Sequence, residues 1–407
     1  MLATLELVAF GVYRAVTGGL FSYAAIRAEQ ARRGGAGATA LPSSGETGRP
    51  QQFLRDDVLH PYLGFVGDPA IDPGFSNLGF WGPLGTPPPR RAPDRLLVGI
   101  FGGSLAADFY EYGGERLKER LRESGRWPGR EIVLVNTAYG GYKQPQQLMA
   151  LTWLLALGGE LDVLVNLDGF NEVALDAVEN AAQGVFPAYP RGWALRVERF
   201  SDPALVERVG AVAFLRARQA ALADRFAATP WRFSVTAGLV WTLLDRRASN
   251  DLAEARRALN AFQPADRRYQ ATGPARPGSD EAVYEELADL WQRGSMQLDR
   301  LCRSNAIRYV HFLQPNQYVE GSKPLAPEER RVAIDPSHPY RQGVEQGYPL
   351  LRQRGQALAA QGVAFRDLTG VFAGIEEPLY VDTCCHVNRR GYERLADAIA
   401  AALTASR

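Results

Sequence analysis

Cysteine and histidine are scarce in this chain of 407 residues, which contains three cysteines and four histidines. The cysteines, Cys302, Cys384 and Cys385, cannot build a disulfide framework and match no zinc-binding spacing, so we interpret them as reduced packing residues. The sequence also lacks a phosphate-binding loop, a Rossmann glycine fingerprint and a His-Glu-x-x-His motif. We therefore expect neither a cofactor nor a metal ion.

A surplus of charge of one sign is also missing. The 46 basic residues balance the 45 acidic ones to a net charge of +1, so the composition indicates no nucleic-acid partner. Hydrophobic residues make up 46% of the chain, which is typical of a soluble globular enzyme. A core of about 300 residues can form one domain and leaves the remainder for an N-terminal segment and an insertion.

The N-terminus lacks an uninterrupted apolar run, although its first 26 residues are mostly apolar. Glu6 and Arg14 leave residues 15–26 as the longest uncharged piece, which is too short to span a bilayer comfortably. No basic residues precede the apolar run and no Ala-x-Ala ends it, so a cleavable signal peptide is not indicated. Two alternatives remain for residues 1–26, a helix in peripheral contact with a membrane and a helix packed on the protein, and the compartment stays open.

Short β-type runs alternate with helical patterns along the rest of the chain. Helices are expected at 115–123 and 144–157, and in a last segment where Leu395, Ile399 and Leu403 recur every four residues. This alternation predicts a mostly parallel sheet with helices on both faces. The expected strands are 96–101, 132–136, 161–167, 308–313 and 363–368.

Three short motifs that carry polar side chains lie at or near the expected element ends. They are Phe101-Gly-Gly-Ser104-Leu105, Asp168-Gly-Phe-Asn171-Glu172 and Val381-Asp382-Thr-Cys-Cys-His386. Because open α/β sheets place their sites at the carboxyl ends of the strands, we expect these motifs to meet there. Together they supply a nucleophile, an amide donor and an acid/base pair, which is the equipment of a serine hydrolase.

The choice of catalytic residues follows from what a serine needs. Its hydroxyl is a poor nucleophile until an imidazole takes its proton and a carboxylate fixes the tautomer of that imidazole. Two of the four histidines precede a proline and His311 lies in an apolar run, whereas His386 has Asp382 close by and a helical pattern after it. We therefore predict a triad of Ser104, His386 and Asp382. The alternative is a helix N-cap at Ser104 and a cap or packing role for His386.

In this order, the motifs resemble the sequence blocks of the SGNH (GDSL-like) esterase superfamily, over roughly residues 95–402. Ser104 corresponds to the nucleophile of the first block, where Gly103 replaces the commonest Asp. Asn171 corresponds to the side-chain oxyanion donor of the third block, where Glu172 replaces the usual Asp. By itself, Asn171 could equally form an Asx-turn.

The second and last blocks complete the resemblance. The stretch from Asn136 to Gly141 is similar to the second block, and its spacing gives Gly141 the role of oxyanion glycine, with Gly140 as the alternative if the turn is shifted by one residue. An ordinary turn is the simpler interpretation of these two glycines. Asp382 and His386 match the last block but are four positions apart instead of three.

The resemblance implies a three-layer α/β/α flavodoxin-like sandwich of about five strands, with a helical insertion. It also implies a serine-dependent carboxylic-ester hydrolase of the esterase or deacetylase type that forms an acyl-enzyme on Ser104. The oxyanion would be held by the backbone N–H groups of Ser104 and Gly141 and by the Asn171 amide. Small-molecule or carbohydrate esters are the expected substrates. Two alternatives stay open, an O-acyltransferase that acts on a glycan and a catalytically silent module for glycan binding or assembly.

The expected domain organisation follows the changes in composition. Residues 1–52 form the apolar segment and a Gly/Ala/Ser/Pro-rich linker, 53–94 a loop-rich segment that wraps over the sheet, and 95–402 the hydrolase domain. Within that domain the strand signal lapses over about 173–304, where Asp202-Pro203 is typical of a helix start. Because this helical insertion directly follows the third block, we expect it to overhang the active site.

Overall fold

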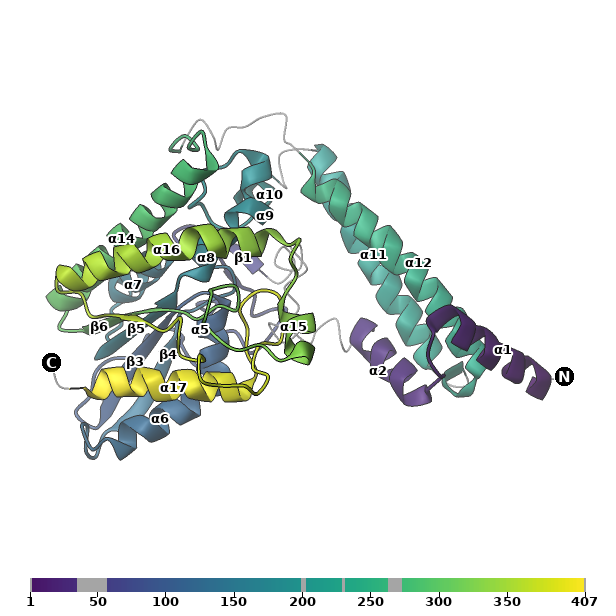
Figure 1. The fold of residues 1–407 in the computed structure, drawn as a ribbon, viewed down its shortest axis with the longest axis horizontal. Helices are drawn as coiled ribbons and strands as arrows, with labels where there is room; N and C mark the ends of the chain where they lie inside the picture. The colour runs from purple at the N-terminus through teal and green to yellow at the C-terminus, as the bar shows by residue number, and fades with distance from the viewer. Residues whose placement is uncertain (1, 35–56, 199–202, 229–230, 263–272, 406–407) are drawn as a thin grey trace. The chain divides into compact units, whose positions relative to one another are not determined.

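The computed structural model describes residues 2–34, 57–198, 203–228, 231–262 and 273–405 (Figure 1). The chain divides into two compact units. One comprises Met1–Pro42 and Val197–Ala265, and the other Ser43–Arg196 and Asp266–Arg407. Most of the linker expected before residue 53 lies outside the described residues.

The larger unit is built on one five-stranded sheet in which every neighbouring pair is parallel, as the alternation of strands and helices predicts. Apart from Arg95, β3 is buried along its whole length, because helices cover both faces of the sheet. A continuous apolar run is the pattern expected of a strand buried on both faces. In sheet order the strands are β4 (Glu131–Asn136), β3 (Arg95–Gly102), β5 (Val163–Asp168), β6 (Arg308–Leu313) and β7 (Phe365–Asp367).

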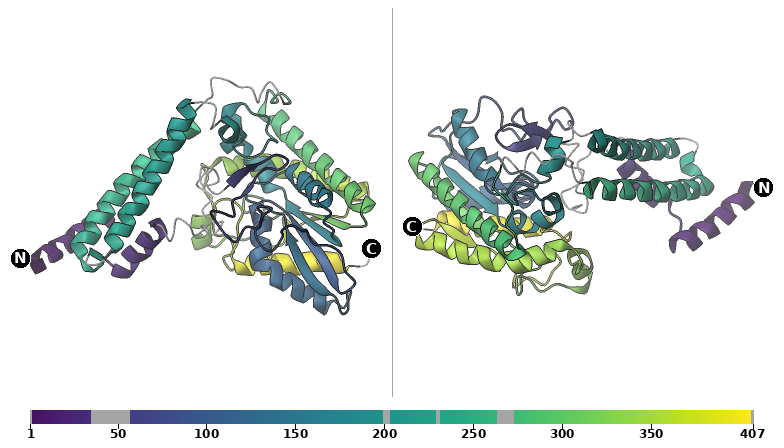
Figure 2. Two further views of the ribbon diagram at one scale, coloured as in Figure 1. Left: turned by 180° about the vertical axis from the view of Figure 1, so that it is seen from behind. Right: turned by 90° about the horizontal axis from the view of Figure 1, so that it is seen from above.

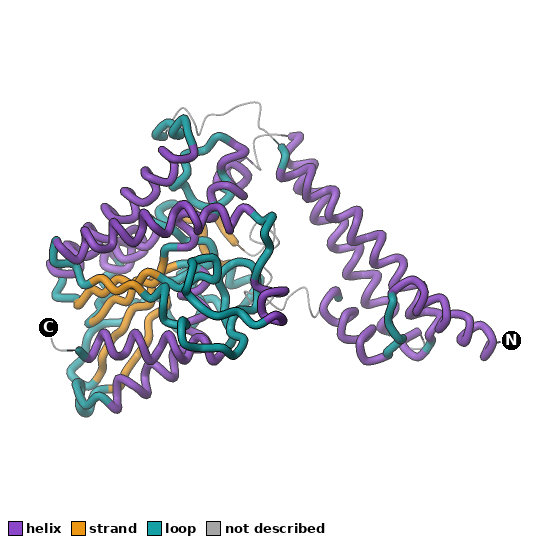
Figure 3. Tube along the Cα trace, viewed as in Figure 1, coloured by secondary structure: helices purple, strands orange, loops and turns teal. Residues whose placement is uncertain are grey.

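Helices cover the sheet on both sides, which gives a three-layer α/β/α arrangement (Figures 1 and 3). α6 (Gly114–Glu123) and α17 (Arg389–Thr404) pack together on one face, and α17 buries the Leu395, Ile399 and Leu403 repeat. The helices of the other face are α7 (Gln146–Ala156), α14 (Asp280–Ser304) and α16 (Pro339–Ala360). The expected helices and the fold class are therefore confirmed at this level.

The segment before the sheet begins with a hairpin of β1 (Asp57–His60) and β2 (Gly64–Gly67) and continues as loops to residue 94. It is bonded to the end of β4 and to the loop that follows. The Tyr142 hydroxyl donates to the carbonyl of Phe65 at 2.6 Å, and the Asn136 amide donates to the carbonyl of Trp81 at 3.2 Å. The loop that carries the candidate oxyanion glycines is thus supported from outside the sheet.

The smaller unit consists of α1 (Leu2–Thr17), α2 (Tyr23–Arg33), α11 (Pro203–Ala227) and α12 (Val235–Asn260) (Figure 2). α11 and α12 pack on each other, α1 packs on α12 and α2 packs on α11. α11 begins at the proline expected in its first turn. No helix among the described residues is both long enough and apolar enough to cross a membrane.

The boundaries of the two units differ from the domain boundaries expected from the sequence. The N-terminal segment and the middle of the helical insertion fold together, because each pairs with the other, and α14 belongs instead to the cover of the sheet. The insertion that is separate from the sheet is therefore shorter than residues 173–304. That it overhangs the active site stays a prediction.

Candidate active site

The structure brings the three predicted triad residues together at the carboxyl edge of the sheet. Ser104 is the first residue of α5 (Ser104–Asp108), which follows β3 directly, and Asp382 and His386 lie on the loop before α17. The His386 ring joins the other two, with Nε2 2.8 Å from Ser104 Oγ and Nδ1 2.6 Å from Asp382 Oδ2. His386 and Asp382 are buried, whereas Ser104 is partly exposed.

The loop geometry accommodates the four-residue spacing between Asp382 and His386. Asp382 Oδ1 accepts the backbone N–H groups of Cys384, Cys385 and His386 at 2.9, 3.1 and 3.2 Å. The chain therefore folds back around one carboxylate oxygen and presents the imidazole to the other. The extra residue lengthens this turn without separating the acid from the base.

Asp108 is a charged neighbour of the triad that the sequence analysis missed. It lies one helical turn after Ser104 on α5 and accepts the Tyr392 hydroxyl at 2.9 Å. Burial raises the pKa of Asp108 to about 6, against the opposing effect of nearby His386. Burial by itself would lower the pKa of His386, but Cys385, Asp382 and Asp108 outweigh it and raise that pKa to about 10. The Ser-x-x-x-Asp spacing, which places both residues on one helix face, was the available signal.

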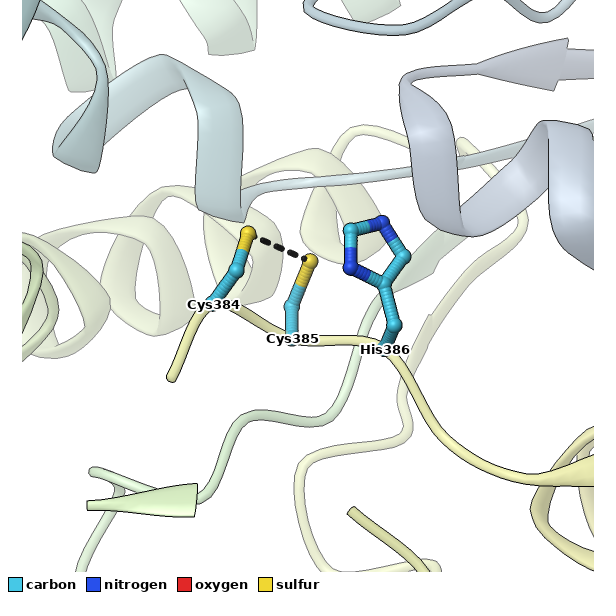
Figure 4. Close-up of side chains that lie close together, drawn as sticks. All are labelled: Cys384, Cys385 and His386. Atoms are coloured by element: carbon cyan, nitrogen blue, oxygen red, sulfur yellow. Dashed lines mark hydrogen bonds between the residues drawn. The ribbon is translucent and has the colours of Figure 1, made fainter. Parts of the chain in front are cut away.

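Two cysteines stand directly beside the candidate base (Figure 4). The thiols of Cys384 and Cys385 are buried and 3.2 Å apart, and with His386 they form a group of potential metal donors within 4.8 Å of one another. Burial raises the pKa of the Cys384 thiol well above its usual value, and both ring nitrogens of His386 already have partners in the triad. The donors therefore do not fit a metal ion while the triad is assembled. The sequence-based expectation of no metal stays a prediction.

Asn171 lies beside the nucleophile, on α8 (Phe170–Ala174) at the end of β5. Its Nδ2 donates to the carbonyl of Tyr142 at 2.8 Å, which leaves its second hydrogen for another acceptor. A Cβ atom at Gly103 would lie 2.1 Å from that Nδ2. The amide therefore packs directly on the backbone before Ser104, and this contact explains why a glycine occupies position 103.

Gly140 and Gly141 are the central residues of a turn closed by the Tyr142 N–H and the Tyr139 carbonyl at 3.0 Å. Gly141 has φ +82°, which favours glycine, and a Cβ atom there would lie 2.0 Å from Cδ of Arg191. Gly140 has open space around it. Among the described residues, no acceptor is bound to the backbone N–H of Ser104 or of Gly141. Neither predicted backbone donor is therefore used in a described internal hydrogen bond, and Gly141 is buried beside Arg191.

Glu172 ties the third block to the loop after β4. Its carboxyl group accepts the backbone N–H of Gly169 at 2.9 Å, the backbone N–H of Gln144 at 3.0 Å and the Gln147 amide at 3.2 Å. Burial, together with the charge of nearby Asp168, raises its pKa to about 8. Glu172 thus holds the loops that carry Gly141 and Asn171 in a fixed relation, and it does not contact the triad in the described bonds.

A second Ser-His-Asp set lies beneath the site. His311, on β6, has Nδ1 2.8 Å from Ser295 Oγ and Nε2 2.7 Å from Asp168 Oδ1, and Trp291 Nε1 also donates to Asp168 at 2.7 Å. Ser295 and His311 are 0% exposed and Asp168 is 1% exposed, so no substrate reaches them. Solvent access therefore separates the two sets and favours Ser104 as the nucleophile.

Comparison with known proteins gives no match to a family model and none to a curated protein sequence. The geometry of the site is therefore the basis for assigning a function.

Proposed function

We propose that this protein is a serine-dependent carboxylic-ester hydrolase of the esterase or deacetylase type, with an SGNH-like fold and site. The observation that carries the proposal is the continuous hydrogen-bonded relay from a partly exposed Ser104 through His386 to Asp382. The order of the motifs and the parallel α/β/α sheet support the SGNH resemblance. Small-molecule or carbohydrate esters are the substrates that this chemistry suits.

The proposed reaction is a double displacement. Ser104 Oγ attacks the ester carbonyl while its proton moves to Nε2 of His386, and Asp382 at Nδ1 stabilises the imidazolium that forms. The proton then passes to the departing alkoxide as the carbon–oxygen bond breaks, which leaves an acyl group on Ser104. Water, deprotonated by His386, attacks the acyl carbonyl, and the acid is released as Ser104 regains its proton.

Charge on the carbonyl oxygen is the main cost of both steps, and preorganised donors offset it. The free backbone N–H groups of Ser104 and Gly141 and the second hydrogen of the Asn171 amide are the proposed donors. Asn171 is suited to this because its bond to Tyr142 fixes the amide before substrate arrives. A glycan O-acyltransferase would use the same acyl-enzyme with a sugar hydroxyl in place of water.

Incubation with p-nitrophenyl acetate and with a fluorophosphonate probe tests the proposal. The wild-type protein should release p-nitrophenol and take up the probe on Ser104, and Ser104→Ala should abolish labelling and lower kcat at least about a thousandfold. Ser295→Ala is the matched control, because that serine also contacts a histidine that is bonded to an aspartate but has no exposure. A wild-type protein that neither hydrolyses nor labels would favour the silent module, and acetyl transfer only with an added glycan would favour the acyltransferase.

A further inference from the structure

α1 has the reverse of the polarity expected for a helix on the surface of a soluble protein. Its packed face consists of Glu6, Ala9, Tyr13 and Thr17, which follow the spacing of one helix face toward α12. Its exposed side chains are mainly large and apolar. They are Leu5, Leu7, Val8, Phe10, Val12 and Val16, exposed by 52, 74, 58, 39, 40 and 38%. Large apolar side chains exposed in this number on one helix indicate an interaction site.

The single acidic residue of α1 is used inside the unit. Glu6 accepts the Ser234 hydroxyl at 2.7 Å and the backbone N–H groups of Val235 and Thr236, the first residues of α12, at 2.5 and 3.3 Å. Further along, Arg246 donates to the carbonyl of Val16 at 3.0 Å. The two helices therefore run alongside each other in the same direction, and the α1 orientation that exposes the apolar face is fixed at both ends.

α12 continues the apolar surface. Val240, Leu243 and Leu244 recur at helical spacing on the turns alongside α1 and are exposed by 41, 45 and 41%. We define these three residues and the six exposed residues of α1 as the apolar face.

The segments that carry the apolar face contain more basic than acidic residues. Residues 2–34 and 231–250 contain seven arginines, no lysine and three acids. Each acid is engaged within the unit: Glu6 caps α12, Glu29 pairs with Arg32 and Arg33, and Asp245 accepts the Gln219 amide at 2.8 Å. An apolar face carried by segments in which arginines outnumber acids matches the interfacial region of a bilayer that contains anionic lipids.

We propose that the apolar face of α1 and α12 binds the surface of a membrane rich in anionic lipid, with α1 lying in the interface. At about 1.5 Å per residue, the 16 residues of α1 reach about 24 Å, less than the hydrocarbon thickness, so the helix lies on the membrane and does not cross it. The buried apolar side chains supply the affinity and the arginines select the anionic headgroups. This site is independent of the proposed esterase chemistry.

Vesicle flotation of the full chain tests the proposal, with neutral phosphatidylcholine vesicles and with vesicles that also contain phosphatidylglycerol. The wild-type protein should float with the anionic vesicles, and less with neutral vesicles or in high salt. The double variant Leu7→Ser/Val8→Ser should bind at least about tenfold more weakly. Ile71→Ser/Val332→Ser removes two exposed apolar side chains of the larger unit and should bind as the wild type does.

Circular dichroism and p-nitrophenyl acetate hydrolysis of the same variants show whether they are folded. Unchanged flotation of folded Leu7→Ser/Val8→Ser overturns the proposal. So does a wild-type protein that ignores vesicles but forms an oligomer that this variant dissociates, since the face would then bind a second copy. Equal binding to neutral and anionic vesicles would show that the arginines do not select anionic headgroups.

Discussion

Replacement of Gly103 by alanine tests the oxyanion hole without touching a predicted catalytic group. The new Cβ would lie 2.1 Å from Nδ2 of Asn171, far inside contact distance, so the buried amide must leave its place and lose its bond to Tyr142. Loss of one oxyanion donor costs about 10²–10³ in kcat, or about 2.7–4 kcal/mol. KM should change little, because the donor acts on charge that develops in the transition state.

A double-mutant cycle shows whether the effect passes through the amide. Asn171→Ala alone should lose about as much kcat as Gly103→Ala, and in that background Gly103→Ala should cost less than about threefold, since the clashing atom is gone. Gly140→Ala, with nothing within 4 Å of its new Cβ, is the matched control and should stay within about twofold of the wild type. Steady-state kinetics with p-nitrophenyl acetate give kcat for the wild type, the two single variants, the double variant and the control. Additive losses, or a fully active Gly103→Ala, would refute this account of Asn171.

Four further outcomes follow from the site. Asp382→Asn should lower kcat by about 10⁴, less than His386→Ala at about 10⁶, and a silent Asp382→Asn would indicate a dyad. Because His386 accepts a proton only when neutral and its pKa is raised to about 10, kcat/KM should increase with pH toward that value. In pH–rate profiles, Cys385→Ser should move this increase to lower pH, because Cys385 raises the pKa of His386, and the control Cys302→Ser should not. Coincident profiles for Cys385→Ser and the wild type would show that Cys385 does not affect the pKa of His386. Ser295→Ala should keep its activity but lower the free energy of unfolding by about 1–3 kcal/mol in urea titrations, and a large loss of kcat would contradict a structural role.

The sheet and the proximity of Ser104, His386 and Asp382 were predictable because they depend on local patterns. A buried parallel strand is a run of apolar residues, and β3, β5 and β6 have such runs within two residues of the expected bounds. Ser104 and His386 each flank a regular element, so the fold of the sheet brings them to one edge. The spacing of Asp382 was harder to interpret, because its competence depends on backbone hydrogen bonds that a motif does not contain.

Other features depend on contacts between distant residues. His311 lies in an apolar run, so nothing in the sequence indicated that it has polar partners. Those partners, Ser295 on α14 and Asp168 at the end of β5, are distant in the chain. From the sequence, Gly103 was only a departure from the motif. In the structure, the Asn171 amide occupies the place that a side chain at position 103 would need. The pairing of α1 with α12 was unpredictable because the packed face of α1 is largely polar or small and its large aliphatic side chains stay exposed, against the usual pattern.

The turn around Asp382 bears on how relatives of this protein can be recognised. One oxygen of the carboxylate accepts three successive peptide N–H groups and the other meets the imidazole, so this chain joins acid and base in a closed ring of atoms across a four-residue gap. A search pattern with a fixed gap between acid and base discards such chains. A three-dimensional template of serine, imidazole and carboxylate atoms would retrieve them.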